Sequence, residues 1–179
     1  MKTALLIIDV QDALCTGEWA MFEIDRVIET INGLSAKARL AGVPVVLVQH
    51  EEAEGPMQFG GAGWQLAQGL AVSPADARVR KKTPNSFHGT DLQALLQAQH
   101  IGRLIVCGLQ SDFCVDTTVR QALALGYDVT LVEDAHSTMD NGVLTAAQIT
   151  AHHNATLKHL TSFGPRMVVV PAAEVTIEV

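Results

Sequence analysis

The chain has 179 residues, of which 48% are hydrophobic and 4% aromatic, and its formal net charge is −7. A single domain of this length can bury a substantial core without a disulfide framework or a structural metal. The acidic balance and the lack of a basic run argue against nucleic-acid binding and against attachment to an anionic membrane surface.

The cysteines and the first residues bear on the compartment. Cys15, Cys107 and Cys114 are odd in number and form no CxxC pair, which fits a reducing cytoplasm. The apolar run 4–8 ends at Asp9, so it is too short for a signal peptide or a membrane span. We therefore expect a soluble, cytoplasmic protein with no nucleic-acid or membrane partner.

The first part of the chain alternates strand and helix patterns. Residues 4–8 are typical of a buried strand, 11–20 of a loop, 24–40 of an amphipathic helix, and 43–49 of a second buried strand. Short links between such elements indicate right-handed crossovers and a parallel sheet.

A long segment, residues 51–74, breaks this alternation and carries five glycines together with Phe59 and Trp64. Long loops in compact domains are usually functional or disordered. The aromatic residues suit a lid or a pocket wall, although Trp64 could equally be docked on the core. The GGAG at 60–63 lacks the Lys-Ser/Thr of a P-loop and the setting of a dinucleotide fingerprint, so it is weak evidence for phosphate binding.

The second half continues the alternation. We predict strands at 78–82, 104–107, 127–132 and 166–170, a helix from Thr90 with a Thr90–Gln93 capping box, and a helix over 144–160. Residues 175–179 could add an edge strand or pair with another subunit. The sequence thus predicts one domain over 1–179, a doubly wound three-layer α/β/α fold with a six-stranded parallel sheet in the common order 3-2-1-4-5-6.

Cys114 follows one of these strands at the start of a predicted helix that Ser111 or Asp112 can cap. Unpaired N–H groups and the macrodipole at a helix N-terminus favour an anion, which would lower the thiol pKa and create a nucleophile. Alternatively, Cys114 is a small buried apolar residue.

Topology brings other polar residues toward the same crevice. Ligands of doubly wound sheets bind beyond the carboxyl ends of the strands, where strand order reverses between the first and fourth strands. Asp9 ends the first strand, and the fourth leads to Cys114. Lys81 and Lys82 end the third strand, and topology leaves open which of them reaches the crevice, or whether both are solvated surface charges.

Three segments, LLIIDVQDAL, KKTPNSFHGTDL and VCGLQSDFCVDTTVRQALALGYDVTLVEDAHST, occur in this order. They resemble the motifs of the isochorismatase-like cysteine hydrolases, and the resemblance covers nearly the whole chain. It implies a catalytic triad of Asp9, Lys81 and Cys114, in which Lys81 is preferred to Lys82 because it precedes Phe87 by six positions.

The resemblance also implies details around this triad. It places a cis peptide bond at Leu109-Gln110 and an oxyanion hole made by the backbone N–H groups of Gln110 and Cys114. We further expect four residues to contribute to substrate binding, namely Gln11, His50, Trp64 and Phe87.

The implied reaction is hydrolysis of a C–N bond in a small amide, cyclic amide or ureido compound through a thioester, as in an amidohydrolase without a cofactor. VQHEEAEG at 48–55 offers His50 but no Asp-x-His of the metal-binding nicotinamidases, so we expect no metal. The His50 segment, the glycine-rich loop and AHHNATL at 151–157 look most like the streptothricin hydrolase-like subgroup. His152 and His153 are adjacent, make a poor metal pair and suit a surface or subunit contact.

Two other functions compete with amide hydrolysis. Isochorismatase-type cleavage of a vinyl ether needs no cysteine nucleophile. A non-catalytic or redox-sensing protein on the same scaffold would oxidise Cys114, for which neither Cys107 nor Cys15 is an obvious resolving thiol. The family resemblance also suggests a homodimer or homotetramer.

Overall fold

A computed structural model describes residues 1–178 and contains one six-stranded parallel sheet. The strand order is β3-β2-β1-β4-β5-β6, as predicted. β1 and β4 are therefore central neighbours at the point where strand order reverses. The strands are β1 (Lys2–Ile8), β2 (Val45–His50), β3 (Ala77–Lys81), β4 (Ile101–Leu109), β5 (Asp128–Ser137) and β6 (Met167–Val170).

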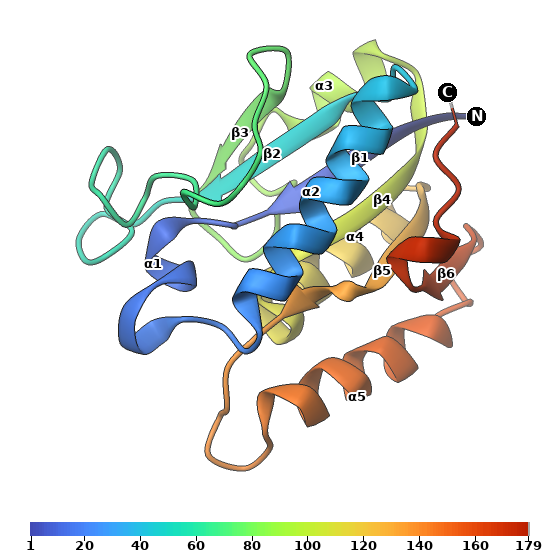
Figure 1. Cartoon of the computed structure of the whole chain (residues 1–179). Helices are drawn as coiled ribbons and strands as arrows, with labels where there is room; N and C mark the ends of the chain where they lie inside the picture. The colour runs from blue at the N-terminus through green and yellow to red at the C-terminus, as the bar shows by residue number, and fades with distance from the viewer. Residues whose placement is uncertain (179) are drawn as a thin grey trace.

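Helices cover both faces of this sheet, which confirms the three-layer prediction. α2 (Ile24–Leu40) runs across the near face in Figure 1, with α3 (Leu92–Ala98) and α4 (Asp116–Ala124) behind the sheet. α5 (Ala146–Lys158) lies beside β5 and β6. Among the described residues, no helix is long and apolar enough to cross a membrane.

The continuous apolar run of β1 is explained by burial on both faces. Ala4, Leu6 and Ile8 pack with α3 and α4, whereas Leu5 and Ile7 pack with α2. Successive strand residues point to opposite faces, so a strand between two helical layers needs apolar residues at every position. The two resulting core clusters hold the central strands rigidly, and with them the residues at their ends.

Gly108 marks the closest approach of β4 to β1. Its φ is +117°, and a Cβ at this position would overlap the backbone N, C and O atoms of Ile8. Only glycine fits such a conformation and such a contact without displacing a strand.

We expect Gly108→Ala to lower the free energy of unfolding by about 3 kcal/mol or more, because the new methyl group meets backbone that cannot move aside. Gly126→Ala is the matched control: its φ of +95° is also unfavourable, but its Cβ would meet nothing within 4 Å. The control should lose only about 1–2 kcal/mol. Urea unfolding of both variants measures the difference, and equal losses would contradict the assigned backbone contact.

Several predicted boundaries and caps were wrong. Asp91, not Thr90, is the N-cap residue of α3, and it makes no side-chain cap bond. The Thr90 hydroxyl accepts the Leu92 N–H at 3.3 Å and donates to the Ser86 carbonyl at 2.6 Å. The predicted loop 11–20 contains a short helix, α1 (Asp12–Cys15), and a 3₁₀ turn at Gly17–Trp19. In each case short-range hydrogen bonds set the boundary of a helix, and the hydrophobic periodicity of the sequence does not encode that boundary.

The C-terminal segment does not form the edge strand that was one of two possibilities for residues 175–179, and pairing with another subunit stays a prediction. Ala172–Glu174 form a 3₁₀ turn, and residues 175–178 are not in a strand. Val175 and Ile177 instead pack against the core cluster on the α2 face. Val179 lies outside the described residues.

Candidate active site

Asp9 stands directly after β1 and turns the chain sharply. Its φ is +52°, in the left-handed region that aspartate tolerates better than most residues. Its N–H donates to the Val48 carbonyl at 2.9 Å, and its own carbonyl accepts the Gln11 N–H at 2.9 Å. This turn holds the carboxylate in the interior, where only 1% of the residue is exposed.

Lys81, at the end of β3, is the lysine that meets this carboxylate. Its Nζ donates to Asp9 Oδ2 at 2.6 Å, and its side chain is 0% exposed. The side chain of Lys82 points the opposite way, is 78% exposed, and lies 3.8 Å from Glu51. Burial alternates along β3, so Val79 and Lys81 point inward and Arg80 outward, whereas Lys82 follows the end of the strand.

Cys114 completes the cluster from the other side of the switch point. Its Sγ accepts from Lys81 Nζ at 3.2 Å, so one ammonium group contacts both the carboxylate and the sulfur. The predicted cis peptide bond is present at Leu109-Gln110. Instead of lying in the first turn of a regular α-helix, Cys114 lies in a π-helical turn, Ser111–Val115, that precedes α4. Such turns are rare and frequently occur at functional sites.

The expected low thiol pKa is not what this environment produces. Burial, followed by the negative charge of Asp9, raises the pKa of Cys114 to about 12, and Lys81 offsets only part of this increase. The helix-terminus argument took no account of burial, which is the largest cause of the shift in the pKa of Cys114. The resting group is therefore a neutral thiol beside a carboxylate that can accept its proton.

This arrangement predicts the pH dependence of Cys114 alkylation by iodoacetamide. The midpoint in the wild type should lie above about 8.5, the reference value of a free thiol. Asp9→Asn should lower the midpoint by removing the neighbouring negative charge, whereas Lys81→Met should raise it by removing the positive one. Peptide mass spectrometry measures the rates, and a fall in midpoint on Lys81→Met would contradict this arrangement of charges.

His50 ends β2 and contacts the same ammonium. Its Nδ1 lies 3.3 Å from Lys81 Nζ. Burial and then the charge of Lys81 lower the pKa of His50, which favours the neutral ring. A neutral imidazole whose Nδ1 accepts a hydrogen bond from Lys81 helps to fix the ammonium between Asp9 and Cys114.

The Gln11 side chain hydrogen-bonds to the backbone of His50 and Trp64. Its Nε2 donates to the carbonyls of His50 at 2.9 Å and Trp64 at 2.8 Å, and its Oε1 accepts the His50 N–H at 2.7 Å. Gln49 Nε2 adds a second bond to the Trp64 carbonyl at 3.0 Å. These bonds attach the long loop to the ends of β1 and β2.

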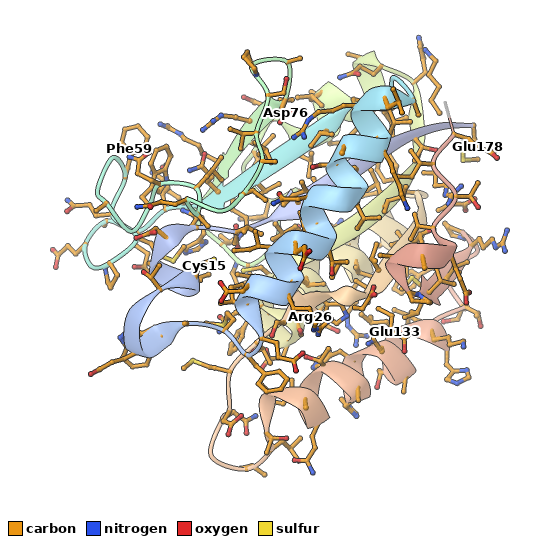
Figure 2. All side chains as sticks on the ribbon, viewed as in Figure 1. Cys15, Arg26, Phe59, Asp76, Glu133 and Glu178 are labelled. Carbon is orange, nitrogen blue, oxygen red and sulfur yellow. The ribbon has the colours of Figure 1, made fainter. Side chains whose placement is uncertain are left out.

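An aromatic cluster lies on this loop. The rings of Phe59 and Trp64 meet edge to face at 4.9 Å, and the Arg80 guanidinium lies 4.2 Å from the Phe59 ring centre. Phe59 occupies the outer part of the loop in Figure 2. Trp64 Nε1 is buried without a hydrogen-bond partner, as is Asp9 Oδ1. Unpaired buried polar atoms near a site are groups that a ligand can satisfy.

The remaining residues singled out in the sequence make none of the hydrogen bonds that join Asp9, Lys81 and Cys114. Phe87 is buried in the core on the α4 face and stacks on Tyr127 at 5.8 Å. His153 Nδ1 lies 3.2 Å from Asp116 Oδ1, while His152 is exposed on α5. Within residues 1–178, no three His, Cys, Asp or Glu side chains are grouped so that they could hold a metal ion.

Sequence reasoning missed a buried histidine near the π-helical turn Ser111–Val115. β5 continues past its predicted end at residue 132, and after a register shift His136 pairs with Gly108. Its Nδ1 lies 2.8 Å from Ser111 Oγ, and its Nε2 lies 2.8 Å from Asn154 Oδ1. The available signal was a histidine shortly after an apolar strand, near the strand ends where ligands bind.

Comparisons with known proteins bear on this geometry. A model of the isochorismatase domain matches residues 3–170. A streptothricin hydrolase from Streptomyces noursei is 42% identical over 138 residues, which are 76% of this chain and 50% of that protein. The chain thus spans about half the length of the two streptothricin hydrolases that it matches.

Solved structures give the same result at the level of the fold. An isochorismatase from Pseudomonas putida KT2440 superposes with a TM-score of 0.88 and 34% identity, covering 97% of this chain and 90% of that one. An N-carbamoylsarcosine amidase from Thermoplasma acidophilum superposes with a TM-score of 0.82 and 25% identity, covering 98% and 99% of the two chains.

Proposed function

The chain belongs to the isochorismatase family, and from this premise we propose that it is a cysteine-dependent hydrolase of a C–N bond in a small molecule. One observation carries the proposal: Lys81 Nζ contacts both Asp9 Oδ2 at 2.6 Å and Cys114 Sγ at 3.2 Å in a buried cluster. This cluster combines a nucleophile, a proton acceptor and a fixed positive charge. We assign catalysis to Asp9, Lys81 and Cys114.

In the first step the thiol proton passes to Asp9, and Sγ attacks the carbonyl carbon of the substrate. The negative charge of Asp9 contributes to the raised pKa of the Cys114 thiol, and Lys81 holds this carboxylate beside the sulfur, so the acceptor is already in place. Lys81 stabilises the thiolate as it forms. The backbone N–H groups of Gln110 and Cys114 are the proposed donors to the oxyanion.

In the following steps Asp9 protonates the departing nitrogen, which leaves as ammonia or an amine and produces a thioester on Cys114. Asp9 then accepts a proton from water, and the resulting hydroxide equivalent attacks the thioester. Collapse of that second adduct releases the acid and returns the proton to sulfur. No cofactor is required for this sequence.

The substrate class that we propose is a small amide, cyclic amide or ureido compound. The name of one matched protein, an N-carbamoylsarcosine amidase, supports this class, and the name of another, a streptothricin hydrolase, supports hydrolysis. His50 and Trp64 are the proposed substrate contacts on the loop side of the triad. Gln11 and Phe87 stay in the proposal as residues that shape the pocket, through their bonds to loop backbone and their packing in the core.

The redox-sensing alternative receives no support from the other two cysteines. Cys107 and Cys15 pack with the α2-side core cluster, whereas Cys114 packs against the cluster on the opposite face of the sheet. Burial, followed by the negative charges of Asp12 and Asp25, raises the pKa of Cys15 to about 12, with no lowering contribution of the kind that Lys81 makes at Cys114.

Trapping the thioester tests the proposal directly. A panel of amides, cyclic amides and ureido compounds is scored by ammonia release, and an active compound is quenched in acid for intact-protein and peptide mass spectrometry. The expected result is an acyl adduct on Cys114, with none on Cys15. If the wild type turns over the compound but shows no adduct on Cys114, even under conditions that slow hydrolysis of a thioester, the result would count against a thioester intermediate. The predicted homodimer or homotetramer is tested separately by light scattering.

A further inference from the structure

A series of hydrogen bonds joins α5 to the turn that carries Cys114, Ser111–Val115, called the nucleophile turn below. Ser111 Oγ lies 2.8 Å from His136 Nδ1 and 3.3 Å from Thr150 Oγ1, and His136 Nε2 lies 2.8 Å from Asn154 Oδ1. Asn154 Nδ2 in turn donates to the Glu133 carbonyl at 3.1 Å. These hydrogen bonds thus connect the nucleophile turn, β5 and α5, three elements that are separated in the sequence.

The bonding partners fix the direction of each hydrogen bond. Because Asn154 Nδ2 donates to Glu133, its Oδ1 must accept from His136 Nε2–H. Burial lowers the pKa of His136 to about 4, so the ring is neutral and its Nδ1 is an acceptor. Ser111 therefore donates its hydroxyl hydrogen to Nδ1 and can accept from Thr150. Every polar atom of the imidazole has a partner, which defines one tautomer and one ring orientation.

Ser111 is the first residue of the π-helical turn and follows Gln110, the first proposed oxyanion donor. It is 0% exposed, so a substrate cannot reach its hydroxyl, and a nucleophilic role for this Ser-His-Asn arrangement is excluded. What the hydroxyl can do is hold the start of the turn. Three residues later in the same turn, Cys114 must keep its Sγ within reach of Lys81 and Asp9.

We propose that Ser111, His136 and Asn154 are positioning residues that hold the nucleophile turn, and thereby Cys114, in its reactive alignment against Asp9 and Lys81. The inference rests on the proposed function for its catalytic consequence, although the alignment of Cys114 can be measured without a substrate. A misplacement of the order of 1 Å at a reacting atom can cost about 100-fold in rate. Buried hydrogen bonds that hold the position of Cys114 Sγ can therefore have a large effect on the rate.

Two substitutions at the half-buried Asn154 separate alignment from folding. Asn154→Leu removes the acceptor for His136 Nε2–H, whereas Asn154→Asp keeps an oxygen at that place. The matched control is Thr145→Ala, which removes the capping box of the same helix without touching the chain of bonds. Urea unfolding of all three variants gives the folded fraction, and rates are measured where each is at least nine-tenths folded.

Cys114 alkylation at fixed pH is the first readout. We expect its rate to change at least about threefold in Asn154→Leu and to stay within about 1.5-fold of wild type in Asn154→Asp and Thr145→Ala. On an active amide, kcat should fall at least about tenfold in Asn154→Leu with KM within about twofold, and Asn154→Asp should recover most of the loss.

An unchanged alkylation rate in Asn154→Leu would overturn the inference whichever way kcat moves. A loss that Thr145→Ala reproduces would also overturn it, because it would then follow from the stability of α5 alone. If the wild type hydrolyses no amide but the alkylation pattern holds, the positioning role stands and the proposed reaction fails, so the two ideas fail separately.

Discussion

Cys114→Ala is expected to lower kcat for amide hydrolysis by at least about 10⁴-fold, because removal of a nucleophile that acts together with its base and charge partner leaves only binding and the oxyanion donors. The fold should persist, since Cys114 is only partly buried and alanine adds no atoms. Ammonia release measures the rate, and circular dichroism measures the fold.

Cys15→Ser is the control for general thiol loss, because Cys15 lies in α1 and packs with the α2-side core cluster. Its activity should match that of the wild type. A variant Cys114→Ala that retained full hydrolysis of the same substrate would remove the thioester from consideration. The vinyl ether reaction, which does not use a cysteine, predicts instead that cleavage of a vinyl ether survives Cys114→Ala.

Lys81→Met should destabilise the protein by about 3–5 kcal/mol in addition to abolishing turnover. The substitution leaves the carboxylate of Asp9 buried without its ammonium partner, and Asp9 Oδ1 already lacks a hydrogen bond. No partner then offsets the free-energy cost of burying the Asp9 carboxylate away from water. Urea unfolding at pH 7 measures the loss.

A double substitution provides the decisive comparison. Asp9→Asn combined with Lys81→Met removes both charges, so it should be more stable than Lys81→Met alone, which is the pattern expected of a coupled buried pair. Lys82→Met is the matched control one residue away, and it should change stability by no more than about 0.5 kcal/mol because its side chain is 78% exposed. Simple additivity of Asp9→Asn and Lys81→Met would contradict a coupled buried pair.

The fold could be predicted from the sequence because its strands are short apolar runs closed by turn residues. The run 4–8 before Asp9 and the run 104–107 before Gly108 both became central strands, as their burial on two faces requires. What the pattern could not supply was the end of each element. β5 extends to Ser137 through a register shift, and no periodicity predicts an irregular pairing of this kind.

The candidate site was predictable to a different degree. Asp9 and Cys114 follow from topology alone, since both come after neighbouring strands at the switch point. Choosing Lys81 over Lys82 depended on motif spacing, and the structure supplies the physical reason in the alternation of β3. The thiol pKa was predicted in the wrong direction because burial depends on packing from several elements, which the local sequence around Cys114 does not reveal.

The polar chain behind the nucleophile lay beyond sequence reasoning for a similar cause. Its members are 25 and 18 residues apart along the chain, from Ser111 to His136 and from His136 to Asn154. A lone histidine and a lone asparagine carry no pattern until the fold brings them together. Hydrogen bonding across elements is therefore the kind of information that only coordinates provide.

The attachment of the long loop through Gln11 and Gln49 has a consequence for how this scaffold can diversify. Both glutamines hold the backbone carbonyl of Trp64, so the anchor does not depend on which side chains the loop displays. Asp9, Lys81 and Cys114 are fixed separately by the strands and the nucleophile turn. Exposed positions such as Phe59 can therefore be substituted while Asp9, Lys81 and Cys114 keep their relative positions. Substrate preference and chemistry can therefore be changed separately. Libraries confined to the exposed, non-glycine residues of 52–62 should sample new specificities with little loss of folded, competent protein.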